Sequence, residues 1–263
     1  MKVLILGASG FIGGALTAAL RARGDEVLTA TLRDPSAAAA FAQSCDAVVN
    51  LAGEPIAQRW NYVVKQRIEA SRVEVPRRFI EALARQSRRP QTYVSASAIG
   101  YYGTSETATF VEESTPGDGF LARVCVVWER EAQRAAGLGM RVACVRTGIA
   151  LATGGGALAK MLPPFRAGAG GRIGNGRQWF SWIHIDDLVG IYIMAIDRAE
   201  GPLNATAPHP VTNSDFTKAL AAALHRPALL PVPAFALRAI LGEGAEALLH
   251  GQRVLPERTS ALH

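Results

Sequence analysis

Cysteine is scarce in this sequence. The chain holds only three cysteines among its 263 residues, Cys45, Cys125 and Cys144, and all three stand in apolar surroundings. A small and odd number of cysteines excludes a disulfide framework and indicates free, buried thiols of a cytoplasmic protein. The chain also has no His-Glu-x-x-His motif and no cysteine cluster, so we expect it to hold no metal.

Long apolar runs and a basic stripe are missing as well. No run reaches the roughly 18 residues that cross a membrane, and the first apolar run is too short for a signal peptide. The net charge is a modest +6, and the arginines are scattered without interleaved aromatic residues. We therefore expect neither a membrane nor a nucleic-acid partner. Moderate positive charge equally suits a small anionic ligand.

Glycine is concentrated near the start of the chain. Gly7, Gly10 and Gly13 follow an apolar run at 1–6 and open a stretch with helical spacing over 12–20. In such a strand-turn-helix unit, Gly7 permits a tight turn, Gly10 lets a pyrophosphate approach the backbone, and Gly13 lets the helix pack closely. The helix N-terminus then faces the phosphates with free N–H donors. This context predicts dinucleotide binding, and a plain glycine turn is the alternative.

The stretch GASGFIGGAL has the spacing Gly-x-x-Gly-x-x-Gly and resembles the extended short-chain dehydrogenase/reductase superfamily, which includes nucleotide-sugar epimerases and dehydratases. The resemblance implies an α/β fold, a Rossmann doubly wound parallel sheet with a small C-terminal substrate lobe. It implies a nicotinamide cofactor, with Ser9, Phe11 and Ile12 beside the glycines as further contacts. We expect an NADP-binding domain over 1–150, rejoined by 183–206. Residues 151–182 and 207–263 would form the substrate lobe.

The end of the second predicted strand, 26–31, decides between NADP and NAD. An acidic residue there binds the ribose hydroxyls of NAD, whereas an arginine accommodates the 2′-phosphate of NADP. Thr31 occupies the strand end, and Leu32, Arg33 and Asp34 follow. We expect Leu32 and Arg33 to contact NADP, and Asp34 as a ribose ligand is the NAD alternative.

Only one short helix, 35–45, separates this strand from the next, 46–51. A complete crossover at the sheet edge needs more chain, so we expect the usual edge strand and its helix to be reduced or absent. The sequence NLAG ending at Gly53 resembles the strand that lies beside the adenine and ribose in the superfamily. The resemblance implies that Leu51, Ala52 and Gly53 line the cofactor through their backbone.

Residues 59–75 open a predicted long helix whose apolar face continues to Leu83. Together with NLAGEPIA, this stretch resembles an atypical subgroup labelled sugar-nucleotide epimerase or cell-division inhibitor, and the resemblance implies that Arg72 contacts the cofactor. Residues 226–256 resemble the C-terminal lobe of the same subgroup. Related chains continue for a further strand and helix, so we expect the C-terminus of this chain to be shortened.

The catalytic signals lie at the end of the strand predicted over 92–95. The superfamily resemblance implies that Ser97 orients a substrate and that Ser95 lies near the nicotinamide; a serine that satisfies its own backbone is the alternative. The usual Tyr-x-x-x-Lys pair is missing, because Leu121 and Cys125 occupy its two positions. Tyr101 or Tyr102 could supply a phenol instead, although such aromatic residues are more often buried in a core.

These observations leave three hypotheses. The first is an NADP-dependent, epimerase-like oxidoreductase that acts on a small, nucleotide-linked or phosphorylated substrate through Ser97, Tyr101 and Tyr102. The second is a non-catalytic NADPH-binding regulatory protein, which the loss of the tyrosine–lysine pair favours. A nucleic-acid or cell-division interactor ranks last because it rests on charge and a label. A homodimer is one assembly that the sequence allows.

Overall fold

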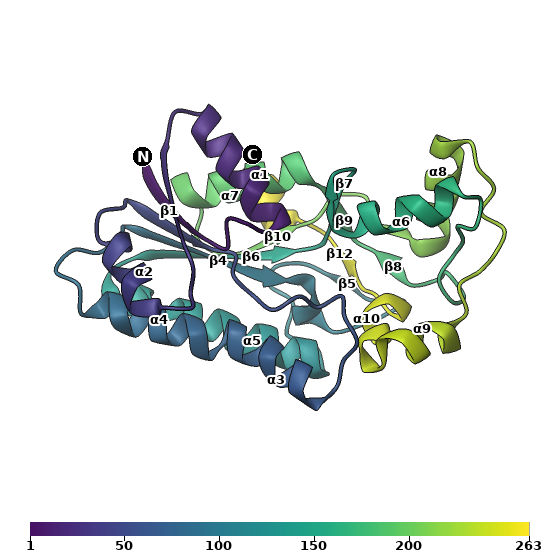
Figure 1. Ribbon diagram of the computed structural model, residues 1–263, viewed down its shortest axis with the longest axis horizontal. Coiled ribbons are helices and arrows are strands. Elements are labelled where there is room, and N and C mark those ends of the chain that lie inside the picture. Colours follow the sequence, from purple (N-terminus) through teal and green to yellow (C-terminus); the bar gives the residue numbers. More distant parts are fainter. Residues whose placement is uncertain (263) are drawn as a thin grey trace.

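The computed structural model describes residues 1–262 and contains a central parallel sheet between two helical layers (Figure 1). Within these residues the sheet has six strands in the order β10-β6-β4-β3-β1-β2. Their bounds are β1 Lys2–Leu6, β2 Glu26–Ala30, β3 Ala47–Asn50, β4 Thr92–Ala98, β6 Arg141–Thr147 and β10 Gly201–Ala205. The predicted α/β doubly wound sheet is confirmed.

Alternating apolar side chains attach a different set of helices to each face of the sheet. Val3 and Ile5 of β1 point into the core under one layer, and Leu4 and Leu6 point into the core under the other, as the two-residue period of a strand requires. The first layer contains α1 (Phe11–Ala22) and α7 (Ile185–Asp197). The second contains α2 (Pro35–Ala42), α4 (Glu74–Ala84) and α5 (Phe120–Gln133) (Figure 1).

The edge of the sheet is shorter than in a full Rossmann domain. Within residues 1–262, β2 pairs with β1 alone and ends the sheet. From β2 the chain passes through α2 directly to β3, on the opposite side of β1. The predicted loss of the outer strand is therefore confirmed, and the end of β2 is left open beside Arg33.

The predicted long helix from residue 59 onward is wrong. The structure has two helices, α3 (Tyr62–Arg72) and α4, which meet at Val73 with φ −111° and ψ −64°. Pro76 explains the break, because it has no N–H to donate to Arg72, four residues earlier, and its ring crowds that carbonyl. The break leaves Arg72 at the C-terminal end of α3.

The remaining elements lie outside the main sheet and its two helical layers. They are η1 (Ile99–Tyr102), β5 (Thr109–Phe110), η2 (Ala136–Leu138), β7 (Ile149–Ala152), α6 (Gly156–Arg166), β8 (Trp179–Phe180), β9 (Trp182–His184), β11 (Val211–Thr212), α8 (Asn213–Leu224), α9 (Ala234–Leu241), η3 (Glu243–Ala245), α10 (Glu246–Leu249), β12 (Arg253–Val254) and α11 (Glu257–Ala261). Helices α6, α8 and α9 lie away from the main sheet (Figure 1).

The last helix returns to the main sheet. The buried carboxylate of Glu112 accepts hydrogen bonds from the backbone N–H groups of Asn204 and Thr259 and from the Thr259 hydroxyl, all at 3.1 Å. These contacts attach α11 to β10 and stabilise both. The proposed division of the chain into 1–150, 151–182, 183–206 and 207–263 stays a prediction.

Candidate functional site

A cavity of about 850 Å³ follows the carboxyl ends of the parallel strands. Its wall contains Gly7 after β1, Leu51 after β3, Ser97 in β4 and Thr147 at the end of β6. Helices α3 and α5 and the segment 243–252 complete the wall. Ligands of open α/β sheets bind at this edge, where the chain changes direction between neighbouring strands.

The glycine loop forms one end of this cavity, as predicted. Gly7 has φ +88°, and a Cβ on Gly13 would lie 2.3 Å from the carbonyl oxygen of Gly7, so neither position admits a side chain without displacement. Gly10 is the N-cap of α1, which has no side-chain cap and no acidic residue in its first turn. The free N–H groups and positive dipole end of α1 therefore suit a pyrophosphate. Phe11 and Ile12 also line the cavity, whereas Ser9 is exposed outside the cavity wall.

The end of β2 assigns different roles to Arg33 and Asp34. The Asp34 carboxylate accepts hydrogen bonds of 3.0 Å from the N–H groups of Ser36 and Ala37 and caps α2. The Arg33 side chain is exposed and has no hydrogen-bond or ion-pair partner in the described part of the chain. Leu32 is buried in the apolar core beneath them. The Arg33 guanidinium is therefore available to a ligand. The Asp34 carboxylate, which would bind the ribose of NAD, is instead engaged in capping α2.

Arg72 is a buried cation in the cavity wall. Its guanidinium donates to the carbonyl oxygens of Glu54 at 3.0 Å and Ile68 at 3.2 Å and to the hydroxyl of Ser71 at 3.2 Å. It has no carboxylate within ion-pair distance among the described residues, and burial lowers its pKa. The Gly53 backbone lies against this guanidinium. Arg72 and Gly53 thus meet next to Leu51 and Ala52, and their contact with a cofactor stays a prediction.

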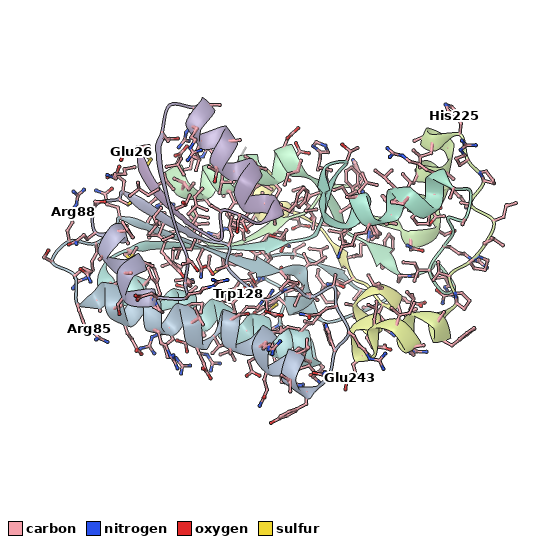
Figure 2. The ribbon with its side chains drawn as sticks, in the orientation of Figure 1. Glu26, Arg85, Arg88, Trp128, His225 and Glu243 are labelled. Atoms are coloured by element: carbon pink, nitrogen blue, oxygen red, sulfur yellow. The ribbon has the colours of Figure 1, made fainter. Side chains whose placement is uncertain are left out.

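Two buried donors of the wall are unpaired. The indole N–H of Trp128 and the hydroxyl of Tyr192 are inaccessible to solvent and have no hydrogen-bond partner within residues 1–262. The Trp128 ring lies 5.1 Å from the Arg72 guanidinium. Figure 2 shows Trp128 on the α5 side and Glu243 near the C-terminal helices. Unpaired buried donors are costly in a protein interior; the residues that fit a dinucleotide are the uncapped first turn of α1 and the Arg72 guanidinium.

Ser97 belongs to a buried charged network. Its Oγ donates a hydrogen bond of 2.6 Å to Oε1 of Glu129, a residue that α5 supplies. The Glu129 carboxylate also accepts two hydrogen bonds of 2.8 Å from Arg146 of β6. Burial acts to lower the pKa of Arg146, but the Glu129 carboxylate outweighs this effect and raises it. Because the Ser97 proton points to Glu129, the free lone pairs of Oγ can accept a hydrogen bond from a ligand.

The predicted catalytic residues Tyr101 and Tyr102 do not join Ser97 in the cavity wall, nor does Ser95, which was predicted near the nicotinamide. The Tyr102 hydroxyl donates to Oδ1 of Asn204 at 2.7 Å and accepts from Arg146 at 2.9 Å, and burial raises its pKa to about 12. The Tyr101 ring lies 3.6 Å from the Arg146 guanidinium. Ser95 is buried and donates to the carbonyl of Ala96. Only Ser97 of these four residues reaches the cavity.

The positions of the missing tyrosine–lysine pair do face the cavity. Leu121 and Cys125 lie one turn apart on α5 and both line the wall. Burial raises the pKa of the Cys125 thiol to about 12, so this thiol stays protonated near neutral pH. The wall that carries a proton-transfer pair in the superfamily is therefore apolar here. No group of His, Cys, Asp or Glu residues within 1–262 is arranged to hold a metal.

Sequence reasoning missed several residues of the wall. They are Ile56, Trp60, Phe120, Trp128, His250 and Gln252. The Gln252 amide donates to the carbonyl of Ile99 at 2.8 Å, which brings the segment 243–252 onto the end of β4. Glu129 could have been found from its helical spacing, since it lies four residues after Cys125 on the same face of α5.

Comparison with known proteins identifies the family. The model of the NAD dependent epimerase/dehydratase family matches residues 3–206, and a domain of unknown function (DUF1731) matches residues 232–262. The chain belongs to the NAD dependent epimerase/dehydratase family. The predicted resemblance to the extended short-chain dehydrogenases is thereby confirmed, and the glycine loop, β3 and β4 all lie within the matched range.

Similar proteins occur in plants, animals and bacteria. An Arabidopsis thaliana protein, Epimerase family protein SDR39U1 homolog, chloroplastic, is 42% identical and covers 100% of this chain and 82% of its own. The structure of human epimerase family protein SDR39U1 (isoform2) with NADPH matches with a TM-score of 0.93 and 40% identity, over 100% of this chain and 93% of that one. A nucleoside-diphosphate sugar epimerase from Corynebacterium glutamicum matches with a TM-score of 0.79 and 36% identity, over 100% of this chain and 54% of that one.

Several expectations from the sequence stay predictions after these comparisons. Within residues 1–262, no helix has the length and apolarity to cross a membrane. The cytoplasmic location stays a prediction, since the Arabidopsis relative is described as chloroplastic. The homodimer, the shortened C-terminus and the individual roles of the site residues also stay predictions.

Proposed function

We propose that this chain binds NADPH along the carboxyl ends of its strands and acts as an epimerase-like oxidoreductase on a small molecule in the rest of the cavity. The observation that carries the proposal is one continuous cavity that joins the uncapped first turn of α1 to Ser97. The match to the human protein crystallised with NADPH supports the choice of cofactor.

We assign the cofactor-binding groups by their charge and availability. The first turn of α1, opened by Gly10, offers N–H donors to the pyrophosphate. Arg33 at the open edge beside β2 would bind the 2′-phosphate, because a guanidinium matches a phosphate with two hydrogen bonds. Arg72 would supply a further donor beside Leu51 of the cavity wall, where its guanidinium also contacts the Gly53 backbone.

The catalytic role falls to Ser97. NADPH supplies a hydride when it is bound, and the chain must orient the partner of that transfer. The Glu129 carboxylate fixes the Ser97 hydroxyl, so that Oγ presents lone pairs to a substrate hydroxyl. With Leu121 and Cys125 in the place of the tyrosine and lysine, a proton would exchange with solvent through the mouth of the cavity rather than with a side chain in that position.

A second candidate function is a non-catalytic NADPH-binding protein that signals through its occupied state. The apolar Leu121 and Cys125 positions favour it, because proton transfer at that wall would have no titratable group near neutral pH. The two candidates share the cofactor and differ only in turnover.

Nicotinamide fluorescence tests the shared part. We expect NADPH to bind at least about tenfold more tightly than NADH, and failure of both nucleotides to bind would overturn both candidates. Oxidation of NADPH by a panel of carbonyl compounds then separates them. The enzyme requires turnover that Ser97→Ala reduces and that Ser36→Ala, a substitution at an exposed serine of α2, leaves unchanged. NADPH binding without turnover in the panel, together with a cellular role that survives Ser97→Ala, would favour the regulatory protein.

A further inference from the structure

The part of the cavity beyond the cofactor groups has little positive charge. Among the described residues of its wall, Arg72 is the sole arginine or lysine, and it lies beside Gly53 on the side that we assign to NADPH. The other charged groups of the wall are the carboxylates of Asp118, Glu243 and Glu246, with His250 beside them. A second diphosphate would therefore have no cation of the wall to pair with.

Two basic residues near the cavity, Lys65 and Arg238, are paired with carboxylates of the wall. Lys65 forms an ion pair of 2.7 Å with Glu243, and its ammonium group lies 5.0 Å from the centre of the Phe120 ring. Glu246 accepts from Arg238 at 3.1 Å and contacts His250 at 2.8 Å. These pairs hold the segment around α10 against α3 and provide little free positive charge for an anionic ligand.

The remaining wall is largely apolar and aromatic. The Trp60 and Phe120 rings meet edge to face, with centroids 5.6 Å apart. The indole N–H of Trp60 donates to the carbonyl of Ile56 at 2.9 Å, and that of Trp179 donates to the carbonyl of Glu106 at 2.8 Å. With both N–H groups engaged, these indoles present ring surfaces rather than donors to the cavity, which favours ring-shaped ligands; the Arg253 guanidinium lies 5.2 Å from the centre of the Trp179 ring but is not part of the cavity wall.

The polar side chains near the aromatic residues are also mostly engaged. The Ser181 hydroxyl donates to the carbonyl of Gln252 at 2.8 Å and accepts from the N–H of Val254 at 3.1 Å. The Gln252 amide nitrogen is bonded to Ile99. Ser97 keeps free acceptor lone pairs at the boundary with the cofactor groups.

We propose that the substrate is an uncharged, mainly apolar molecule that carries a ring and one hydroxyl or carbonyl group, not a nucleoside-diphosphate sugar. The inference rests on the proposed function, because it assigns Arg72 and the glycine loop to NADPH. Burying a diphosphate against paired carboxylates and apolar rings without a cation is unfavourable. Burying a neutral ring against Trp60, Phe120 and Trp179 is favourable.

Equilibrium dialysis of the protein loaded with NADP⁺, which cannot reduce a ketone, against three probes tests this proposal. Methyl naphthyl ketone and naphthoate share a ring system and differ mainly in charge, and UDP-glucose carries the diphosphate. We expect the ketone to bind at least about tenfold more tightly than naphthoate and UDP-glucose to show no saturable binding. Equal or tighter binding of naphthoate or UDP-glucose, or no binding of the ketone, would overturn the inference while leaving the NADPH measurement intact.

Phe120→Leu and Phe235→Leu provide matched variants. Phe120 lines the cavity, whereas Phe235 on α9 is 76% exposed and lies outside the wall. NADPH binding is measured first and is expected to be unchanged in both. Phe120→Leu should then weaken the ketone about fivefold through loss of ring contact, and Phe235→Leu should leave it unchanged. Equal effects of the two substitutions would contradict the placement of the ligand, and lost NADPH binding in the unsubstituted protein would instead contradict the proposed function.

Discussion

Ser97 and Glu129 form a hydrogen bond of 2.6 Å that joins the end of β4 to α5. The same carboxylate binds Arg146 through both its oxygens. Ser97, the one residue of the predicted catalytic set that reaches the cavity, is therefore oriented by a buried ion pair. Any change at Glu129 should alter both the stability of the packing between α5 and the carboxyl ends of β4 and β6 and the orientation of the Ser97 hydroxyl.

Glu129→Gln should destabilise the protein strongly. The substitution keeps the shape of the side chain but leaves the Arg146 guanidinium, 4% exposed, without a carboxylate. Breaking a buried pair in this way costs about 3–5 kcal/mol, and urea denaturation measures it. Glu81→Gln is the control, because Glu81 and Arg134 form an exposed pair at 3.4 Å whose loss should cost below about 1 kcal/mol. Similar losses of unfolding free energy in the two variants would show that the buried Arg146 guanidinium does not need the Glu129 carboxylate.

Arg33→Ala should change the cofactor preference and not the stability, and Asp34→Ala should change the stability and not the cofactor preference. Arg33→Ala should weaken NADPH binding about tenfold or more and leave both NADH binding and stability unchanged, because the side chain is exposed and unpaired among the described residues. Asp34→Ala should lower the free energy of unfolding by about 0.5–2 kcal/mol through loss of the α2 cap and preserve the NADPH preference. Nicotinamide fluorescence and urea denaturation measure the two quantities. A loss of NADH binding in Asp34→Ala would instead favour the ribose-ligand alternative.

The local sequence was sufficient to predict the parts of this site that lie within one strand-turn-helix unit. The spacing of Gly7, Gly10 and Gly13 predicted the loop at the end of the cavity, because those constraints act within one strand-turn-helix unit. The short interval before β3 predicted the missing edge strand. The choice between Arg33 and Asp34 was harder from sequence, since it depends on which side chain the backbone of α2 engages.

Residues distant in sequence could not be placed in this way. Tyr101 and Tyr102 are adjacent in a short turn, and only the fold shows that Arg146, more than forty residues later, engages both. Trp60 and Phe120 pack together from two different elements, and the pairing of His250 with Glu246 reaches the cavity only because Gln252 is bonded to the end of β4. Such contacts are set by the packing of the C-terminal segment rather than by any local pattern.

Stability should fall in alkaline solution. Burial raises the pKa of Cys125 from 9.0 to about 12 and the pKa of Tyr102 from 10.0 to about 12. Above about pH 9 the unfolded chain releases the Cys125 proton while the folded chain retains it, so stability present below pH 9 is lost as the pH rises toward 12. Each group lowers the free energy of unfolding by up to about 1.4 kcal/mol per pH unit.

Urea denaturation at about pH 8 and about pH 10 measures this loss. Cys125→Ala removes one contributing group, so it should reduce the difference between the two conditions. Tyr62→Phe is the control, because the Tyr62 side chain is exposed on α3 and its substitution should leave the difference unchanged. A free energy of unfolding that is constant over this interval would contradict the raised pKa values.

Gly13→Ala and Gly14→Ala differ by one position in α1 and should have effects of opposite sign. A methyl group on Gly13 would lie 2.3 Å from the carbonyl oxygen of Gly7, so the loop and helix must separate, at a cost of about 1–3 kcal/mol. On Gly14 the nearest atom outside the helix would be 3.8 Å away, an ordinary contact, and alanine should stabilise the helix by about 1 kcal/mol. NADPH binding should be lost only in Gly13→Ala, because displacement of the loop moves the N–H donors of α1. Urea denaturation and nicotinamide fluorescence on the two variants check both effects, and NADPH binding retained in Gly13→Ala would mean that the cofactor does not depend on the close approach of α1 to β1.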